Sequence, residues 1–110
     1  VEHYGLPIIS VVFNNGTLGM VRQWQSLIYD HRYSQTSLEN RSPDFVKFAD
    51  AFGLKGRRVT QPSELEEAIT EALAESAQGR GYVIDCAINA DEMVHPMVNG
   101  GHHITEFLLS

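Results

Sequence analysis

Short apolar runs alternate with amphipathic segments along this chain, and this alternation constrains its fold more than any other feature. Residues 8–13 are a nearly unbroken apolar run after Pro7, which predicts a strand buried on both faces. Residues 57–60 and 82–88 predict two further short strands. With helices between the strands, the pattern indicates an α/β fold: a partial parallel sheet flanked by helices.

Three segments carry apolar side chains at helical spacing. The first is expected to face its core with Met20, Val21, Trp24, Leu27 and Ile28, and to leave Arg22, Gln23 and Ser26 on the other face. The second is expected to be capped by Ser42, with Pro43 in its first turn and a buried stripe of Phe45, Phe48, Ala49 and Phe52. The third begins at Pro62, and its expected inner face is Leu65, Ile69, Ala72, Leu73 and Ser76.

Three strands and three helices are few for a complete parallel sheet, so residues 1–110 are expected to be part of a larger domain. Residues 1–88 would form its α/β core. Residues 89–110 would be an irregular tail, with a final turn at 105–109. The opening at Val1, without an initiator methionine, also suggests the middle of a longer protein.

The net charge of −6 argues against a nucleic-acid partner, because phosphates require a basic surface. No apolar run approaches the roughly 18 residues of a membrane helix, and no polybasic segment offers a membrane anchor. The one cysteine, Cys86, excludes an internal disulfide and is typical of a reducing compartment. A cytoplasmic location is therefore expected, or an organellar stroma if the source is a plant or a fungus.

The segment Asn14-Asn15-Gly16-Thr17 joins the first strand to the first helix. Ligands of open parallel sheets bind at the carboxyl ends of strands, and the N–H groups of a following helix attract phosphate. Asparagine and main-chain carbonyl oxygens suit Mg²⁺. From these residues alone, the segment is either a site for a metal-bound diphosphate or an ordinary strand–helix turn that binds nothing.

Longer stretches of the chain resemble the large catalytic subunit of acetolactate synthase (acetohydroxyacid synthase). The resemblance begins with Pro-Ile-Ile-Ser-Val-Val-Phe-Asn-Asn at residues 7–15 and continues with Leu-Gly-Met-Val-Arg-Gln-Trp-Gln at 18–25. It extends through residues 29–34, 43–49 and 53–59 to Val-His-Pro-Met-Val-Asn-Gly-Gly at 94–101, and so covers nearly the whole chain. The Gly-Met-Val-Arg-Gln-Trp-Gln stretch is the specific part, because paired asparagines alone indicate only the wider thiamine-diphosphate superfamily.

The resemblance implies a transferase that depends on thiamine diphosphate and Mg²⁺ and acts in branched-chain amino acid biosynthesis. Pyruvate would be decarboxylated and its two-carbon unit joined to a second 2-keto acid, while the protein orients and shields the cofactor. FAD would bind in a part of the parent protein outside this chain. The parent would be a homo-oligomer, and the partners of this chain would be small 2-keto acids and the remainder of the catalytic subunit.

The resemblance also assigns roles by position. Asn15 would give its side-chain oxygen to Mg²⁺, and Thr17 its main-chain carbonyl. Leu18, Gly19 and Met20 would lie along the cofactor, with Gly19 permitting a close approach. The channel to the second keto acid would be lined by Val21 and Trp24, of which Trp24 limits the size of the acceptor.

Several features depart from the family pattern, among them Gly16-Thr17 and Gly81-Tyr82, and two missing parts bear on the chemistry. The superfamily motif opens with a Gly-Asp-Gly well upstream of the asparagines, and only 13 residues precede Asn14. The glutamate that activates the cofactor would also come from another domain. We therefore expect no catalytic residue in this chain and no activity from the chain alone. The alternatives are a benzoylformate-decarboxylase-like or glyoxylate-carboligase-like enzyme, and a non-catalytic interaction module.

Overall fold

The computed structural model describes residues 1–38, 41–98 and 100–108 of the chain. Its elements in chain order are β1 (Ile9–Asn14), α1 (Gly19–Leu27), α2 (Phe45–Ala51), β2 (Lys55–Val59), the 3₁₀ turn η1 (Pro62–Glu64), α3 (Leu65–Ala77), β3 (Tyr82–Ala87), β4 (Met97–Val98) and β5 (Phe107–Leu108). The three longer strands and the three helices confirm the predicted α/β order. The first residue of each predicted strand lies no more than two residues from the first residue of the observed strand.

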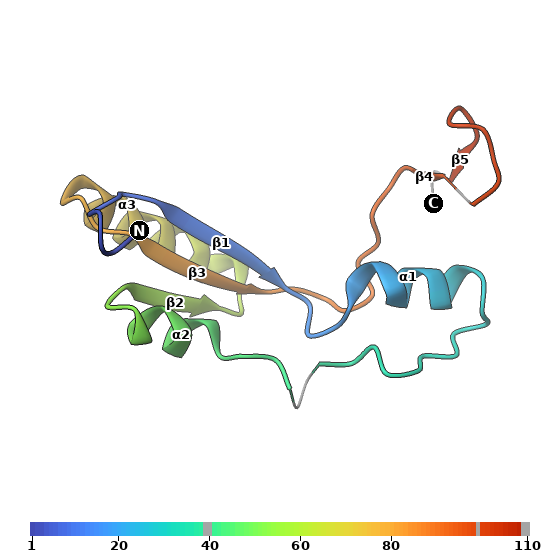
Figure 1. The fold of residues 1–110 in the computed structure, drawn as a ribbon, viewed down its shortest axis with the longest axis horizontal. Helices are drawn as coiled ribbons and strands as arrows, with labels where there is room; N and C mark the ends of the chain where they lie inside the picture. Colours follow the sequence, from blue (N-terminus) through green and yellow to red (C-terminus); the bar gives the residue numbers. More distant parts are fainter. Residues whose placement is uncertain (39–40, 99, 109–110) are drawn as a thin grey trace.

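The three longer strands form a parallel sheet in the order β1-β3-β2, which confirms the predicted parallel sheet (Figure 1). β3 is central because both neighbours pair along it, with Val11 and Arg57 each opposite Ile84. The carboxyl ends of all three strands therefore meet at one edge. In a parallel sheet this edge is where ligands bind.

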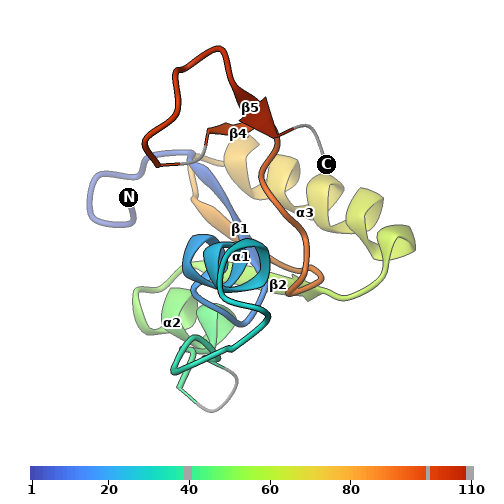
Figure 2. The same ribbon diagram turned by 90° about the vertical axis from the view of Figure 1, so that its right-hand side faces the viewer.

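Helices α2 and α3 cover opposite faces of this sheet, as the end-on view shows (Figure 2). On one face, Ala68 and Ala72 of α3 are fully buried against a core of Val59, Tyr82, Ile84 and Cys86. On the other face, α2 approaches β2 at Gly56, where an added Cβ would lie 3.6 Å from the Cβ of Ala49. Small residues at these contacts let both helices lie close to the strands.

Several predicted core positions are wrong for this chain. β1 is an edge strand, and Val11 and Phe13 are exposed because no helix among the described residues covers them. The large side chains of the predicted inner face of α3 are also exposed, namely Leu65, Ile69 and Leu73. On α2, Ala49 is buried, but Phe48 and Phe52 stack edge to face in solvent with ring centroids 5.1 Å apart. The helices pack through alanines, and these larger apolar side chains stay exposed to solvent.

The cap of α2 also differs from the prediction. Asp44, and not Ser42, is the N-cap, because its carboxylate accepts hydrogen bonds from the Val46 and Lys47 N–H groups at 3.1 Å. Helix geometry begins two residues later than the proline pattern indicated.

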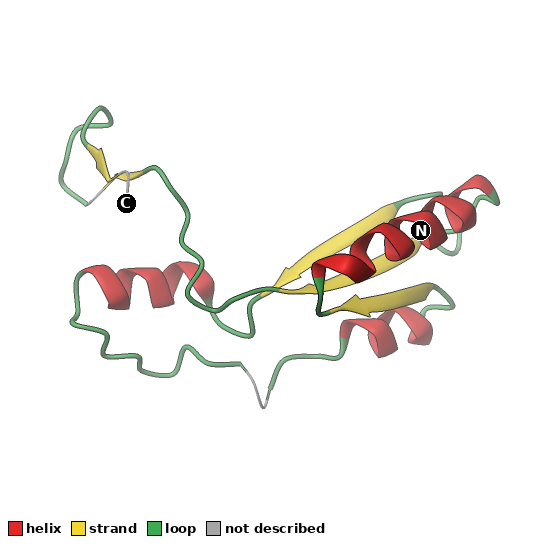
Figure 3. Ribbon diagram, turned by 180° about the vertical axis from the view of Figure 1, so that it is seen from behind, coloured by secondary structure: helices red, strands yellow, loops and turns green. Residues whose placement is uncertain are grey.

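Helix α1 lies beyond the carboxyl ends of the strands and does not cover the sheet (Figures 1 and 3). The tail after β3 runs past α1 to the antiparallel pair β4–β5, where the sequence predicted only a turn at 105–109; residue 109 lies outside the described part.

The radius of gyration is 17.4 Å, whereas a compact domain of this length has about 13 Å. In the described ranges, no helix has the length and hydrophobicity to cross a bilayer.

Candidate functional site at the carboxyl edge

The turn after β1 starts where strand pairing ends. The Ile88 N–H donates to the Asn14 carbonyl at 3.0 Å, so β1 and β3 stay paired to this point. The Asn14 Oδ1 then accepts from the Gly16 N–H, and the Asn15 Oδ1 from the Thr17 N–H, both at 3.1 Å. Gly16 has φ of +64°, a left-handed conformation that glycine adopts without strain. Two successive asparagine turns therefore shape the bend between β1 and α1.

Asn15 lies in a hollow at this edge of about 320 Å³. The hollow is lined by Asn14, Asn15, Gly16, Ser42, Pro43, Arg58, Ala87 and Ile88, so all three strands contribute to it. Arg58 brings the guanidinium group of this lining, and its Nη1 lies 3.2 Å from Oδ2 of Asp85. Asp85 is 1% exposed, and its Oδ1 is buried without a partner among the described residues. Arg58 and the buried Asp85 thus form an ion pair at this edge of the sheet.

Thr17 has two oxygens that the surrounding structure leaves available. Its hydroxyl is buried without a hydrogen-bond partner in the described part of the chain. Its carbonyl lies outside the helical ladder, because the first bond of that ladder runs from the Arg22 N–H to the Leu18 carbonyl at 2.9 Å. A bridge to Ser37 fixes the backbone of Thr17. With Asn15 Oδ1, this turn offers the hard oxygen ligands that Mg²⁺ prefers, so these residues fit the expected ion.

The start of α1 is suited to an anionic group. Leu18 occupies the N-cap position without a side-chain hydrogen bond, and the first turn holds no acidic residue. The first N–H groups of the helix thus have no intrahelical or side-chain acceptor of the usual kind. Leu18 and Met20 are both about half exposed and flank Gly19. Apolar side chains on either side of free N–H groups suit a ligand with a phosphate end and a ring.

The two predicted channel residues line one hollow, further along α1. This open hollow of about 410 Å³ is bordered by Val21, Trp24, Gln25, Tyr29 and Arg32. Trp24 is half-buried, and a Cβ added at Gly100 would lie 3.9 Å from the edge of its indole. The structure therefore brings Val21 and Trp24 together, and separates their hollow from the one at Asn15.

Gln23 is the residue of this region that the sequence pattern misassigned. It was expected on the polar face of α1, yet it is 3% exposed and is the buried residue of that helix. Its amide brackets the backbone of Val94, accepting from the N–H at 2.8 Å and donating to the carbonyl at 3.0 Å. Arg22 adds an ion pair with Asp91 at 2.7 Å and lies over the Tyr33 ring. These contacts hold the tail on α1, and no local pattern reveals them.

Comparisons with known proteins agree with this geometry. The family model described as "Thiamine pyrophosphate enzyme, C-terminal TPP binding domain" matches residues 1–86. The acetolactate synthase isozyme 3 large subunit of Escherichia coli is 40% identical over 107 residues, 97% of this chain and 18% of that protein. The acetolactate synthase of Mycobacterium leprae is 47% identical over 100 residues, 88% of this chain and 16% of that protein.

Among solved structures, the chain is similar to the thiamine diphosphate-dependent 4-hydroxybenzoylformate decarboxylase of Rhodococcus jostii. The TM-score is 0.69 at 25% identity, over 84% of this chain and 16% of that one. This chain thus spans less than a fifth of the length of the relatives that it matches.

Proposed function

This chain belongs to the thiamine pyrophosphate enzyme family as its C-terminal TPP-binding domain, and from that membership we propose that it is part of the catalytic subunit of an acetolactate synthase. The observation that carries the proposal is the asparagine turn at the carboxyl edge, which joins a parallel strand to a helix whose start has no side-chain cap. The identities of 40–47% to acetolactate synthases support this enzyme over others of the family. The parent would serve branched-chain amino acid biosynthesis.

Within this proposal, Asn15 Oδ1 and the Thr17 carbonyl bind Mg²⁺, and Leu18, Gly19 and Met20 contact thiamine diphosphate. The Thr17 hydroxyl, which has no hydrogen-bond partner among the described residues, and the start of α1 without a side-chain cap support these roles. The cofactor, when bound, supplies the carbanion chemistry that decarboxylates a 2-keto acid. The chain itself holds the metal and the diphosphate and excludes water with apolar side chains.

The hollow at Val21 and Trp24 is proposed to admit the second 2-keto acid. Its apolar wall suits the alkyl group of such an acid, and the rigid indole limits how large that group can be. Arg32 at its border offers a positive charge to the carboxylate.

Further features are proposed for the parent protein as a whole. FAD would bind outside this chain, and the remaining Mg²⁺ ligand and the activating glutamate would come from other segments. The parent would be a cytoplasmic homo-oligomer, and these 110 residues alone would be inactive.

A second candidate is a benzoylformate-decarboxylase-like enzyme, which the similarity to the Rhodococcus jostii decarboxylase favours. Such an enzyme would decarboxylate an aromatic 2-keto acid and release the aldehyde. Trp24 argues against it, because an indole beside the substrate leaves less room for an aromatic ring.

Assays of the full-length protein with thiamine diphosphate and Mg²⁺ separate these candidates. We expect 2-acetolactate from pyruvate and no aldehyde from benzoylformate, both read by NMR. Release of benzaldehyde without any acetolactate would replace the first candidate with the second. Measurable acetolactate formation by residues 1–110 alone would contradict the expected inactivity.

The proposed metal site has a matched pair of variants in the full-length protein. Asn15→Ala removes the ligand, while Asn89→Ala removes an asparagine that makes the same kind of turn, to the Asp91 N–H at 3.1 Å. We expect Asn15→Ala to weaken Mg²⁺ binding at least about tenfold and Asn89→Ala to leave it unchanged. Equal affinities in the two variants would remove Asn15 from the metal site.

A further inference from the structure

Gly19, the first residue of α1, is a glycine that its own backbone does not require. Its φ lies outside the left-handed range that Gly16 occupies. Alanine is the better helix former, by up to about 1 kcal/mol in a helix interior. The reason for a glycine at position 19 must therefore lie in the space around its Cα and not in its backbone conformation.

The space that Gly19 leaves is filled by Asn15. A Cβ added at Gly19 would lie 2.6 Å from the Asn15 Nδ2 and 3.7 Å from its Cγ, and beyond its chain neighbours and its own helix backbone no other described atom comes within 4 Å. Real Cβ atoms essentially never approach another atom as closely as 2.6 Å. Because Nδ2 is the end of a side chain, the amide would rotate away at little cost to the fold.

The Asn15 amide is thus held from two sides. Its Oδ1 accepts from the Thr17 N–H at 3.1 Å, and its Nδ2 rests against the bare Cα side of Gly19. Turning the amide away from position 19 would also move Oδ1, because the two atoms share one planar group. Mg²⁺ requires near-ideal octahedral geometry, with oxygen ligands at about 2.0–2.1 Å from the ion. An Oδ1 displaced in this way would no longer meet that requirement.

We propose that Gly19 is a positioning residue of the metal site, which leaves room for the one orientation of the Asn15 amide that presents Oδ1 to the ion. This inference rests on the proposed function, because it takes Asn15 as a Mg²⁺ ligand. It adds a second role to the proposed contact of Gly19 with the cofactor, a role that Gly19 exerts through Asn15.

A double-mutant cycle in the full-length enzyme tests this role. The variants are Gly19→Ala, Asn15→Ser and the two combined, and serine at position 15 is too short to meet a Cβ at position 19. Mn²⁺ replaces Mg²⁺, and its affinity in the presence of thiamine diphosphate is measured by electron paramagnetic resonance. Gly100→Ala is the matched control, because its added Cβ meets nothing closer than 3.9 Å.

Gly19→Ala is expected to weaken Mn²⁺ binding about tenfold or more while the thermal midpoint stays at or above that of the parent. Gly100→Ala should leave the affinity unchanged. In the Asn15→Ser background, adding Gly19→Ala should change the affinity less than about twofold. A crystal structure of Gly19→Ala should show the Asn15 amide rotated in an otherwise unchanged turn.

The possible failures are distinguishable. If Asn15→Ser leaves the Mn²⁺ affinity unchanged, the proposed metal site is wrong and this inference falls with it. If Asn15→Ser weakens binding but Gly19→Ala does not, the metal site stands and the inference is overturned. An equal loss from Gly19→Ala in both backgrounds, or an unmoved Asn15 amide in the crystal, would instead show that Gly19 acts directly on the cofactor.

Discussion

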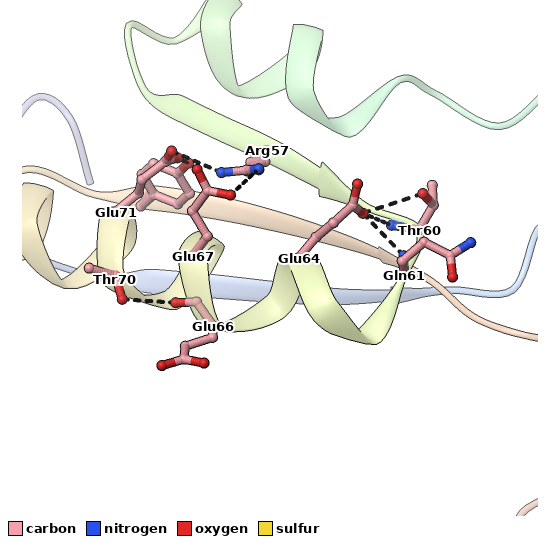
Figure 4. Close-up of polar contacts among 9 residues, drawn as sticks. Arg57, Thr60, Gln61, Glu64, Glu66, Glu67, Thr70 and Glu71 are labelled. Atoms are coloured by element: carbon pink, nitrogen blue, oxygen red, sulfur yellow. Dashed lines mark hydrogen bonds and ion pairs between the residues drawn. The ribbon is translucent and has the colours of Figure 1, made fainter.

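Tyr82 shows how a single side chain links the sheet to a helix. The ring is buried in the core, and its hydroxyl donates to the Glu71 carboxylate of α3 at 2.6 Å. Arg57 bridges Glu67 and Glu71 at 2.9 Å each, so β2, β3 and α3 are joined by one polar network (Figure 4). Burial, and then the hydrogen bond to Glu71, raise the pKa of Tyr82 to about 12.

An alkaline titration should therefore show a late step that belongs to Tyr82. Because its pKa is raised from 10.0 to about 12 in the folded chain, the stability it contributes is present below pH 10 and is lost as the pH rises through 12. Tyrosinate absorbance should show a late step that Tyr82→Phe abolishes and Glu71→Gln moves to lower pH. Tyr4→Phe should leave that step in place. A single tyrosinate step near pH 10 in the chain without substitutions would contradict the assignment of a late step to Tyr82.

The place of the asparagine turn between a strand and a helix could be predicted from the sequence, because the apolar run, the turn and the helical pattern after it are contiguous. Gln23 and Asp85 could not. Each is polar and buried, and each is defined by a partner distant in sequence: Val94 for Gln23 and Arg58 for Asp85. Local periodicity places a glutamine on a solvent face, because it carries no information on a tail that later covers it.

Among the elements, α2 offers a direct choice between two capping residues. Asp44 accepts two backbone hydrogen bonds at the start of the helix, whereas the sequence pattern favoured Ser42. Hydrogen bonding to the Lys47 N–H is the main cause that lowers the pKa of Asp44 below 3.8. The carboxylate therefore contributes stability above that pH and loses its contribution below it.

Asp44→Ala should lower the midpoint of thermal unfolding by about 4 °C at neutral pH, and Ser42→Ala should lower it much less. Asp44→Asn is the conservative variant and should recover most of the difference, because its amide oxygen can also cap. Circular dichroism of the chain measures all three. A larger effect at Ser42 than at Asp44 would mean that the helix begins two residues earlier in solution.

The order of strands and helices could be predicted, because periodicity survives any choice of partner. The buried faces could not be predicted as well. The sheet is met by Ala68 and Ala72, whereas Leu65 and Leu73 are exposed. Small side chains let the helix lie close to the strands, so close packing and not hydrophobicity decides which residues are buried. The sequence pattern weighs side-chain size and so assigns the larger residues to the interior.

Across the whole molecule, apolar side chains remain uncovered on several sides. Val11 and Phe13 lie on the open edge strand, with Phe13 72% exposed, and Leu65, Ile69 and Leu73 extend along α3. Exposed apolar patches next to an unpaired strand edge are typical of surfaces that another segment covers. The radius of gyration is large because α1 and the tail extend away from the sheet and do not pack on it.

The 110-residue chain by itself should therefore self-associate at micromolar concentrations and bind a hydrophobic dye such as ANS. The triple variant Val11→Thr, Phe13→Thr and Leu73→Thr should reduce both signals without loss of circular dichroism. Glu66→Gln, on the polar side of α3, is the control and should change neither signal. Sedimentation of the parent chain as a monomer without dye binding would show that these faces are not adhesive.

The two hydrogen bonds between the Gln23 amide and the Val94 backbone can form only late in biosynthesis. The two residues are 71 positions apart, so α1 leaves the ribosome long before its partner exists. At about 5–20 residues per second, the delay is roughly 4 to 14 seconds. During that interval the buried amide of Gln23 has only water to bond, and Trp24 has no tail beside it. The covering of α1 by the tail is thus among the last features of this chain to be completed as it is made.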